Sequence, residues 1–283
     1  MSKNASSADN PQEMFEHNFY FSGLLAAEMS CSIIKATNKN PKGFYYAIDL
    51  TVTNADKNLL QKINHEVIKN HGIITSVKGA YNLSARGKEK VKIALNFLKK
   101  YPILVGDLAK NRISILETAL EYLSTHKGHS FQKEKTRIMD ALRKKLRDIK
   151  ERRIVDQKFD PINLSEKSLG NFFAGVVDGE GSFGIKSSGL YTQPFFAIAM
   201  KDKKIIESLR NFVDYGNVRL RKDGVYHLEI NNRNILKNIC DMFFNQYPLR
   251  HKKQKNRLKL VKQLLNDYTP KSLNVKFREH DIV

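Results

Sequence analysis

Acidic residues are scarce in this sequence relative to basic ones. Its 283 residues include 29 Asp and Glu against 49 Lys and Arg, which gives a formal net charge of +20. An enzyme that acts on a small neutral substrate does not need such an excess. A polyanion is attracted to it, because each neutralised phosphate releases counterions and adds affinity that is independent of sequence. We therefore expect a nucleic acid as the partner.

Cysteine and long apolar runs are also scarce. Cys31 and Cys240 lie far apart in apolar segments, which excludes a disulfide framework and a cysteine-rich zinc site. His126 and His129 have no Cys or acidic neighbours at zinc spacing. No run of 18 apolar residues occurs, and the first ten residues have no apolar signal core, so we expect a soluble, intracellular protein without a membrane partner. Abundant Lys, Asn and Ile suggest AT-rich coding, as in organelles and some bacteria.

The common phosphate-binding and nucleophile motifs are missing too. The sequence has no glycine-rich loop that ends in Lys-Ser or Lys-Thr, and it has no Gly-x-Ser-x-Gly elbow. An anionic membrane surface is the competing polyanion. No strongly basic amphipathic helix lies at either terminus to bind one.

One segment of the chain is present twice, 152 residues apart. Residues 19–33 (FYFSGLLAAEMSCSI) correspond to residues 171–185 (NFFAGVVDGEGSFGI), with Phe, Gly, a branched pair, Glu, Ser and Ile in register. The similarity continues between residues 47–60 and 193–206, and a Tyr-Pro dipeptide and a Lys-Asn-Arg tripeptide follow in both copies. We infer one fold of about 105 residues that occurs twice.

Each copy alternates between strand and helix periods. Ile48, Leu50 and Val52 alternate with polar residues, which predicts a half-buried strand, and residues 57–68 have helical spacing. The pattern predicts an α+β fold of two pseudo-symmetric αββαββα halves, each an antiparallel sheet with helices on one face. The expected halves are residues 14–125 and 166–270, with a linker at 126–165 and a tail at 271–283.

The linker is the most basic part of the chain. Residues 126–160 contain 12 basic and 6 acidic residues. Ile138, Leu142, Leu146 and Ile149 have helical spacing, so we expect a charged linker helix, followed by a turn at Asp160-Pro161. The alternative is a solvated connector whose charge only promotes solubility.

The repeated segment has small residues on one helical face, and glycine inside a helix requires a packing reason. We expect the two segments to form helices that pack closely on each other and join the halves. The small residues are Ser22, Gly23, Ala26 and Ala27 in the first copy and Gly175 and Gly179 in the second.

This packing would bring Glu28 and Glu180 together at two helix C-terminal ends. Two carboxylates there repel each other and the helix dipole unless a divalent cation lies between them. A shared metal site follows as a hypothesis. The alternative is a helix pair with two solvated acids, which the recurrence in register disfavours.

Residues 173–183 (FAGVVDGEGSF) and, more loosely, residues 21–28 (FSGLLAAE) resemble the two signatures of single-chain LAGLIDADG homing endonucleases. The resemblance extends over about residues 15–268. It implies a saddle of two halves whose sheets line a concave surface along double-stranded DNA. It also implies an intron-homing enzyme that cleaves both strands of a long asymmetric target as a monomer, with Mg²⁺ or another divalent cation.

The resemblance also implies roles for particular residues. Glu28 and Glu180 correspond to the metal-binding acids, and Ala27 and Gly179 to positions whose backbone carbonyls contact metal. Lys253 corresponds to a basic residue beside one active site. In the matching stretch the first copy has Val105-Gly-Asp107, and its nearest lysines, Lys99, Lys100 and Lys110, are not aligned.

Two further departures affect the first motif. Ala26 stands where the family often has an acid, which has little effect if that acid is structural. Met29 stands where the family usually has glycine, and we expect its side chain to crowd the metal or the scissile phosphate. These departures favour the rival hypothesis of an intron RNA maturase or a non-cleaving DNA-binding protein. Glu28 and Glu180 favour the nuclease.

The polar members of each strand alternation are expected to face DNA, with Arg219 and Arg221 as candidates for guanine contacts because Val218 and Leu220 would point into the core. The alternative is an ordinary solvated sheet face. The candidates are Ser30, Ser32, Asp49, Thr51, Thr53, Thr75, Asn82, Ser84, Ser182, Lys186, Ser188, Gln193, Arg219, Arg221, His227 and Glu229.

Overall fold

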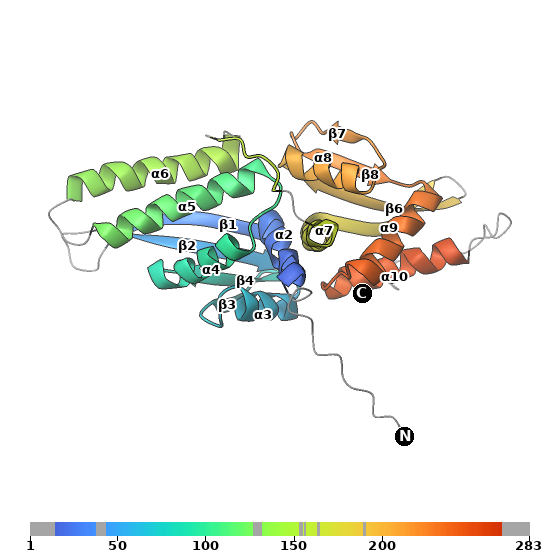
Figure 1. The fold of residues 1–283 in the computed structure, drawn as a ribbon, viewed down its shortest axis with the longest axis horizontal. Coiled ribbons are helices and arrows are strands. Elements are labelled where there is room, and N and C mark those ends of the chain that lie inside the picture. The colour runs from blue at the N-terminus through green and yellow to red at the C-terminus, as the bar shows by residue number, and fades with distance from the viewer. Residues whose placement is uncertain are drawn as a thin grey trace, which may run out of the picture.

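The computed structural model describes residues 15–37, 44–126, 132–152, 155, 157–162, 165–188 and 191–267. Two similar halves lie side by side, with the motif helices α2 and α7 at the centre (Figure 1). The first half contains α2 (Phe19–Glu28), β1 (Met29–Thr37), β2 (Phe44–Asn54), α3 (Lys57–Glu66), β3 (Ile73–Val77), β4 (Ala80–Arg86), α4 (Lys88–Lys100) and α5 (Asp107–Thr125), followed by α6 (Gln132–Arg152). The second half contains α7 (Glu166–Glu180), β5 (Gly181–Ser188), β6 (Tyr191–Met200), α8 (Lys203–Phe212), β7 (Val218–Leu220), β8 (Tyr226–Ile230), α9 (Arg233–Asp241), the π-helix η1 (Met242–Gln246) and α10 (Lys252–Asn266).

Each half has one four-stranded antiparallel sheet, and the two sheets have equivalent topology. The strand orders are β1-β2-β4-β3 and β5-β6-β8-β7. The register is equivalent as well, because Met29 pairs with Val52 in the first sheet and Gly181 pairs with Ile198 in the second. The predicted α+β fold of two similar halves is therefore confirmed.

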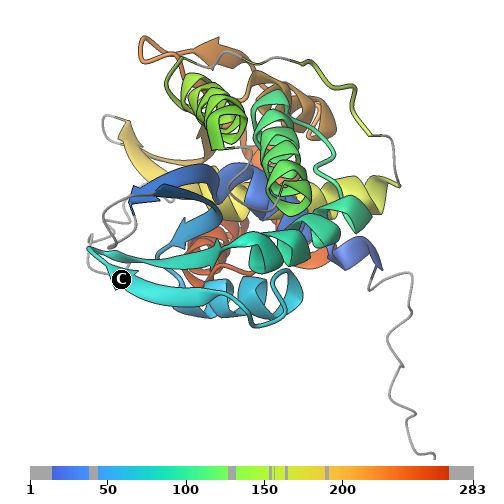
Figure 2. The same cartoon turned by 90° about the vertical axis from the view of Figure 1, so that its left-hand side faces the viewer.

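Alternating burial gives each sheet one core face. Ile48, Leu50 and Val52 on β2 have no exposed surface, whereas Asp49 and Thr51 between them are partly exposed. The helices of each half lie on one side of its sheet (Figures 1 and 2). The partly exposed side chains that alternate with the buried ones on β2 belong to the other face.

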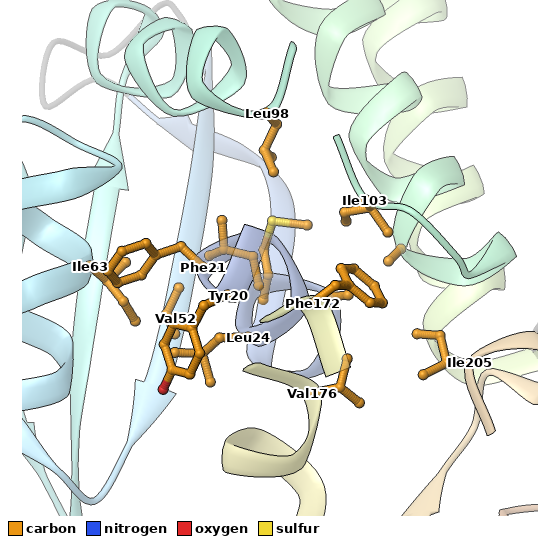
Figure 3. Packing of buried hydrophobic residues seen from close by; sticks show 14 of the residues in the cluster. Tyr20, Phe21, Leu24, Val52, Ile63, Leu98, Ile103, Phe172, Val176 and Ile205 are labelled. Atoms are coloured by element: carbon orange, nitrogen blue, oxygen red, sulfur yellow. The ribbon is translucent and has the colours of Figure 1, made fainter. Parts of the chain in front are cut away.

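The hydrophobic core is continuous through both halves. Figure 3 shows Tyr20 and Leu24 of α2 near Val52, and Phe172 of α7 directed toward Ile103 and Ile205. The buried middle parts of the two motif helices therefore join the halves into one folded unit. No helix in the described part of the chain combines the length and apolarity that a bilayer span requires.

Helix α6 packs on the first half, so the solvated-connector alternative is wrong for this segment. Met139, Leu142, Leu146 and Ile149 are buried against a surface that includes α5 and β1. Asp140 accepts hydrogen bonds from Lys35 Nζ (2.8 Å) and Tyr46 Oη (2.9 Å). The outer face of α6 keeps its exposed Lys and Arg residues, such as Lys144.

Residues 157–162 continue the connector without the turn expected at Asp160-Pro161. The backbone of this segment bonds to neighbouring helices instead of to itself. Asn111 Nδ2 donates to Gln157 O (2.6 Å), and Phe159 N donates to Asp107 Oδ1 (2.9 Å). The other linker residues, 127–131, 153–154, 156 and 163–164, and the expected tail at 271–283 lie outside the described residues.

Candidate active site

The motif helices α2 and α7 contact each other through their backbones. A Cβ atom added at Gly23 would lie 1.8 Å from Phe172 O, and one added at Gly175 would lie 1.9 Å from Tyr20 O. Any side chain at either position would force the helices apart. The expectation that the two motifs form the interface between the halves is confirmed.

This packing places the C-terminal ends of the two helices together. The Cβ position of Gly179 lies 2.6 Å from Ala27 Cβ and 3.2 Å from Glu28 Cγ. The last turn of α7 therefore lies against the last turn of α2, and Glu28 and Glu180 are the final residues of these helices.

The two carboxylates share an unfavourable electrostatic environment. Burial raises the pKa of Glu28 to about 7, and the negative charge of Glu180 contributes to this shift. Asn54 Nδ2 donates to Glu28 Oε1 at 3.3 Å, which opposes it. Glu180 has an open side toward solvent, yet desolvation by the surrounding protein raises its pKa as well, while nearby Lys201 lowers it. A cation between the carboxylates would relieve this repulsion.

The donor set fits a hard divalent cation. Carboxylate and backbone carbonyl oxygens are the ligands that such ions prefer. The carbonyls of Ala27 and Gly179 belong to the last helical turns, where C=O groups lack partners within the helix. Among the described residues no three His, Cys, Asp or Glu side chains cluster as a complete metal site. A bound ion would therefore use Glu28, Glu180, these carbonyls and ligands from outside the chain.

The acid that precedes this site in the second motif has a structural role. Asp178 is buried and accepts hydrogen bonds from Tyr20 Oη (2.6 Å), from Arg250 N and from His251 N (3.0 Å). It thereby fixes the start of α10 to both motif helices. Ala26, its counterpart, is buried in the first half and has no side-chain acceptor for such bonds.

Met29 does not crowd the site, contrary to the sequence-based expectation. Its side chain is only 1% exposed because it occupies the core face of β1, with Cys31 and Ile33. The backbone carbonyl of Met29 accepts a 2.7 Å hydrogen bond from Arg112 Nη1. The residue that replaces glycine therefore packs into the core beneath the sheet.

Lys253 is exposed in the first turn of α10 and lines a cleft of about 740 Å³ between α10 and the β2–α3 connection. Asn54 precedes that connection and contacts Glu28. Arg257, which also lines the cleft, donates to Ser182 Oγ (3.3 Å), two residues beyond Glu180. One lining residue thus reaches the strand that follows Glu180.

The first half has no lysine at the equivalent place. Leu108 is the second residue of α5, as Lys253 is of α10. Lys110 Nζ donates to the carbonyls of Leu104 (3.1 Å) and Asp160 (3.0 Å).

The other two candidate lysines of the first half make contacts elsewhere. Lys99 pairs with Glu117 at 4.0 Å, and Lys100 lies 5.3 Å from the centre of the Tyr101 ring. Neither of these contacts involves Glu28 or the last turn of α2.

Nearly all predicted DNA-facing residues lie on the sheet faces opposite the helices. Their hydrogen bonds include Thr53 Oγ1 to Asn82 Oδ1 (2.7 Å) and Ser84 Oγ to Asp49 Oδ1 (2.8 Å). The strand register places on this face Ser30, Ser32, Asp49, Thr51, Thr53, Thr75, Asn82, Ser84, Ser182, Lys186, Gln193, Arg219, His227 and Glu229. Ser188 ends β5, and its side chain lies outside the described part.

The expectation for Arg221 is corrected. Leu220 is 62% exposed and does not enter the core, and β7 ends there. Arg221 lies in the following turn, where its guanidinium pairs with Asp223 at 3.0 Å. Arg219 remains on the strand, opposite His227.

Sequence reasoning missed several residues that shape the site. Asn54 and Lys201 act on the two carboxylates, and Gln254 Nε2 donates to the carbonyl of Gly181. Asp56 and Asp202 begin α3 and α8 and bind the opposite half. The recurrence of these aspartates in register was the available signal, but their partners become neighbours only when the halves dock.

Comparisons with known proteins agree with this architecture. Residues 173–264 match the family model described as LAGLIDADG endonuclease. The fold is similar to that of the LAGLIDADG homing endonuclease I-GzeII in complex with its DNA target, with a TM-score of 0.73, 17% identity and coverage of 88% of this chain and 90% of that chain. No curated protein sequence matches.

Two further solved structures share the fold. I-SmaMI bound to uncleaved DNA target in the presence of calcium ions has a TM-score of 0.70 at 22% identity, over 91% of this chain and 95% of that chain. The I-LtrWI homing endonuclease bound to target DNA has a TM-score of 0.71 at 21% identity, over 89% of this chain and 91% of that chain.

Proposed function

We propose that this chain is a two-motif member of the LAGLIDADG endonuclease family and a site-specific DNA endonuclease that makes a metal-dependent double-strand break. The match of residues 173–264 to the family model supports the proposal. The observation that carries the proposal is the meeting of Glu28 and Glu180 at the ends of two helices whose backbones are in contact. Two polar sheet faces extend from this point, one on each side. Such an arrangement suits a duplex that crosses both sheets and presents its two scissile phosphates to the carboxylate pair.

The chain's own residues would have distinct parts in the reaction. Glu28 and Glu180, with the carbonyls of Ala27 and Gly179, would hold Mg²⁺ or another divalent cation. When bound, such an ion lowers the pKa of water and neutralises charge on the phosphate. The Lys253 ammonium would offset negative charge that develops on the scissile group. We assign no carboxylate or imidazole among the described residues as the general base. Ordered water would therefore accept the proton of the attacking water molecule.

Target recognition would combine bulk charge with base contacts. The net charge of +20 attracts the DNA backbone, and the polar strand residues would read base edges in the major groove. The two sheets present different side chains, so the target should be long and asymmetric. Both motifs lie in one chain, so we expect one chain per duplex, as sedimentation of the complex would show.

The decisive experiment is cleavage by the purified protein. A pool of candidate insertion sites is incubated with the protein and Mg²⁺, and cut duplexes are sequenced. Glu28→Gln and Glu180→Gln should each abolish double-strand cleavage and retain binding in EDTA, since each removes metal-binding charge and leaves the sheets intact.

Glu207→Gln is the matched control, because Glu207 lies on the surface of α8 in an ion pair with Lys203. It should cleave like the unmodified protein. Undiminished cleavage by either motif variant would refute the active-site assignment. Tight, specific binding without cleavage by the unmodified protein would favour the non-cleaving alternative, which the absence of a lysine at Leu108 supports.

A further inference from the structure

The two sheets differ in side-chain chemistry at one equivalent pair of positions. Ser32 pairs with Asp49 across β1 and β2, and the corresponding pair in the repeat, across β5 and β6, is Gly184 and Phe195. In the first sheet, Asp49 Oδ1 accepts a hydrogen bond from Ser84 Oγ at 2.8 Å. A polar pair in one half thus has an apolar counterpart in the other.

Phe195 lies on the face of the second sheet that is opposite the core. Phe196 and Ile198 on β6 are 0% and 1% exposed, whereas Phe195 beside them is partly exposed. In the described part of the chain, Phe195 is not among the apolar side chains that pack against the core. Ala197 and Ala199 follow on the same face. From Phe195 to its end, β6 therefore offers no side-chain hydrogen-bonding group on this face.

The glycine opposite Phe195 fixes the position of its ring. A Cβ atom added at Gly184 would lie 2.7 Å from Phe195 Cζ and 2.9 Å from Phe195 Cε1, so the ring rests on the β5 backbone. Lys186 Nζ lies 5.9 Å from the centre of the ring and forms an ion pair with Glu229. These two charges engage each other, and the ring keeps an apolar surface that is partly open to solvent.

We propose that Phe195 is a specificity-determining residue that contacts the 5-methyl group of a thymine in the half-site bound by the second sheet. The inference rests on the proposed function. Thymine presents this methyl group in the major groove, where an apolar side chain can contact it. Cytosine and adenine present amino donors there, and beside the ring such a donor would lose water without gaining a partner. At the equivalent place in the first half, Asp49 offers an acceptor, so the two half-sites should differ at the corresponding base pair.

Replacement of thymine by uracil tests the contact, because it removes only the methyl group. A preferred site is obtained by binding selection, and each thymine in it is then replaced by deoxyuridine, one at a time. Affinity is measured in EDTA, so the readout does not depend on cleavage. We expect one or two replacements, all within one half-site, to weaken binding about 3- to 5-fold, the loss expected when one methyl group leaves an apolar contact.

Substitution of Phe195 identifies the side chain responsible. Phe195→Ala should weaken binding to the thymine site and reduce the effect of the same uracil replacements to less than about 1.5-fold. Phe195→Leu keeps an apolar side chain and should retain most of the thymine preference. Phe244→Ala is the matched control, since Phe244 is 40% exposed and belongs to η1, outside both sheets. It should bind and respond to uracil like the unmodified protein.

Two results would overturn the inference. Equal affinity of the unmodified protein for every uracil-containing site would show that the ring only covers the β5 backbone, and this measurement needs no variant to fold. An unchanged uracil effect in Phe195→Ala would assign the methyl contact to another residue. The expected uracil pattern without cleavage in Mg²⁺ would support the inference and refute the nuclease function. Binding without any sequence preference would refute both.

Discussion

The Tyr20 hydroxyl donates a 2.6 Å hydrogen bond to Asp178 Oδ2 across the interface between the two halves. Both residues are buried, and the Arg250 guanidinium lies 4.1 Å from the centre of the Tyr20 ring. Burial and the Asp178 charge raise the pKa of Tyr20, so its hydroxyl remains a donor. One carboxylate thereby connects α2, α7 and the start of α10.

This relationship predicts strong coupling between Tyr20 and Asp178. Tyr20→Phe leaves a buried carboxylate with one donor fewer, which should reduce the free energy of unfolding by about 1–3 kcal/mol. Asp178→Asn and the double variant complete a cycle, and we expect a coupling energy of about 1–3 kcal/mol from denaturant unfolding. Tyr45→Phe is the control, because Tyr45 is 46% exposed. Additive effects of the two substitutions would show that the hydrogen bond contributes nothing.

Alanine at the interface glycines should be severely destabilising. A methyl group at Gly23 or Gly175 would overlap a backbone oxygen of the facing helix, and backbone cannot move aside as a side chain can. We expect Gly23→Ala or Gly175→Ala to lower the free energy of unfolding by more than about 3 kcal/mol, by the cost of overpacking. Gly79→Ala is the comparison. A methyl group there would meet no neighbouring atom, and only the positive φ of 74° disfavours alanine. Similar losses at Gly79 and Gly23 would contradict the close helix packing.

The metal-free protein should lose stability as the pH rises. The pKa of Glu28 is raised in the folded state from 4.5 to about 7, so its favourable contribution is present below pH 4.5 and is lost as the pH rises through 7. The difference should be on the order of 2–3 kcal/mol between pH 5 and pH 8, and it should be smaller in Glu28→Gln. Denaturant unfolding in EDTA measures it. Mg²⁺ should restore stability at pH 8, and a Glu28→Gln profile identical to that of the unmodified protein would refute the assignment.

Base readout and bulk charge can be separated by substitution. Arg219 projects from β7, so Arg219→Ala should weaken specific binding by about 1–3 kcal/mol and relax preference at one or two base pairs. Lys144→Ala on the outer face of α6 should weaken binding to all sequences alike. It should also reduce the slope of log affinity against log salt concentration by up to about one unit, the contribution of one phosphate contact. Arg221→Ala should have a smaller effect than Arg219→Ala, because Asp223 already pairs with Arg221. Site selection and affinity against salt concentration distinguish these outcomes. If Arg219→Ala selects the same base pairs as the unmodified protein, β7 does not read bases.

The internal repeat made most of the fold and the centre of the site predictable. The glycines at 23 and 175 indicated close helix packing, and that packing fixed the positions of Glu28 and Glu180. Alternation along β2 predicted its buried face, because every second residue of a strand shares a face. These predictions depend only on the local spacing of apolar and small residues and on the internal repeat.

The errors concern places where the halves or the linker break that symmetry. Leu220 is exposed at the end of β7, a three-residue strand at the edge of its sheet, so strand alternation overestimated its burial. The side chain of Met29 was expected to crowd the metal because related motifs usually have glycine at this position. The alternation of buried and exposed residues along β1 instead places it on the core face. The contact of Asp56 with Lys252 joins residues 196 positions apart, and no local pattern specifies such a pair.

The contact between α2 and α7 is reciprocal. Gly23 meets Phe172, and Gly175 meets Tyr20, the residues that correspond to each other in the repeat. Each half therefore carries both members of the contact, as the subunits of a two-fold symmetric dimer do. Two copies of either half could close the same interface, and such a dimer would present identical sheets to a palindromic sequence. The single chain has the geometry of a homodimer, yet its two sheets need not be identical, because each belongs to a different stretch of one sequence.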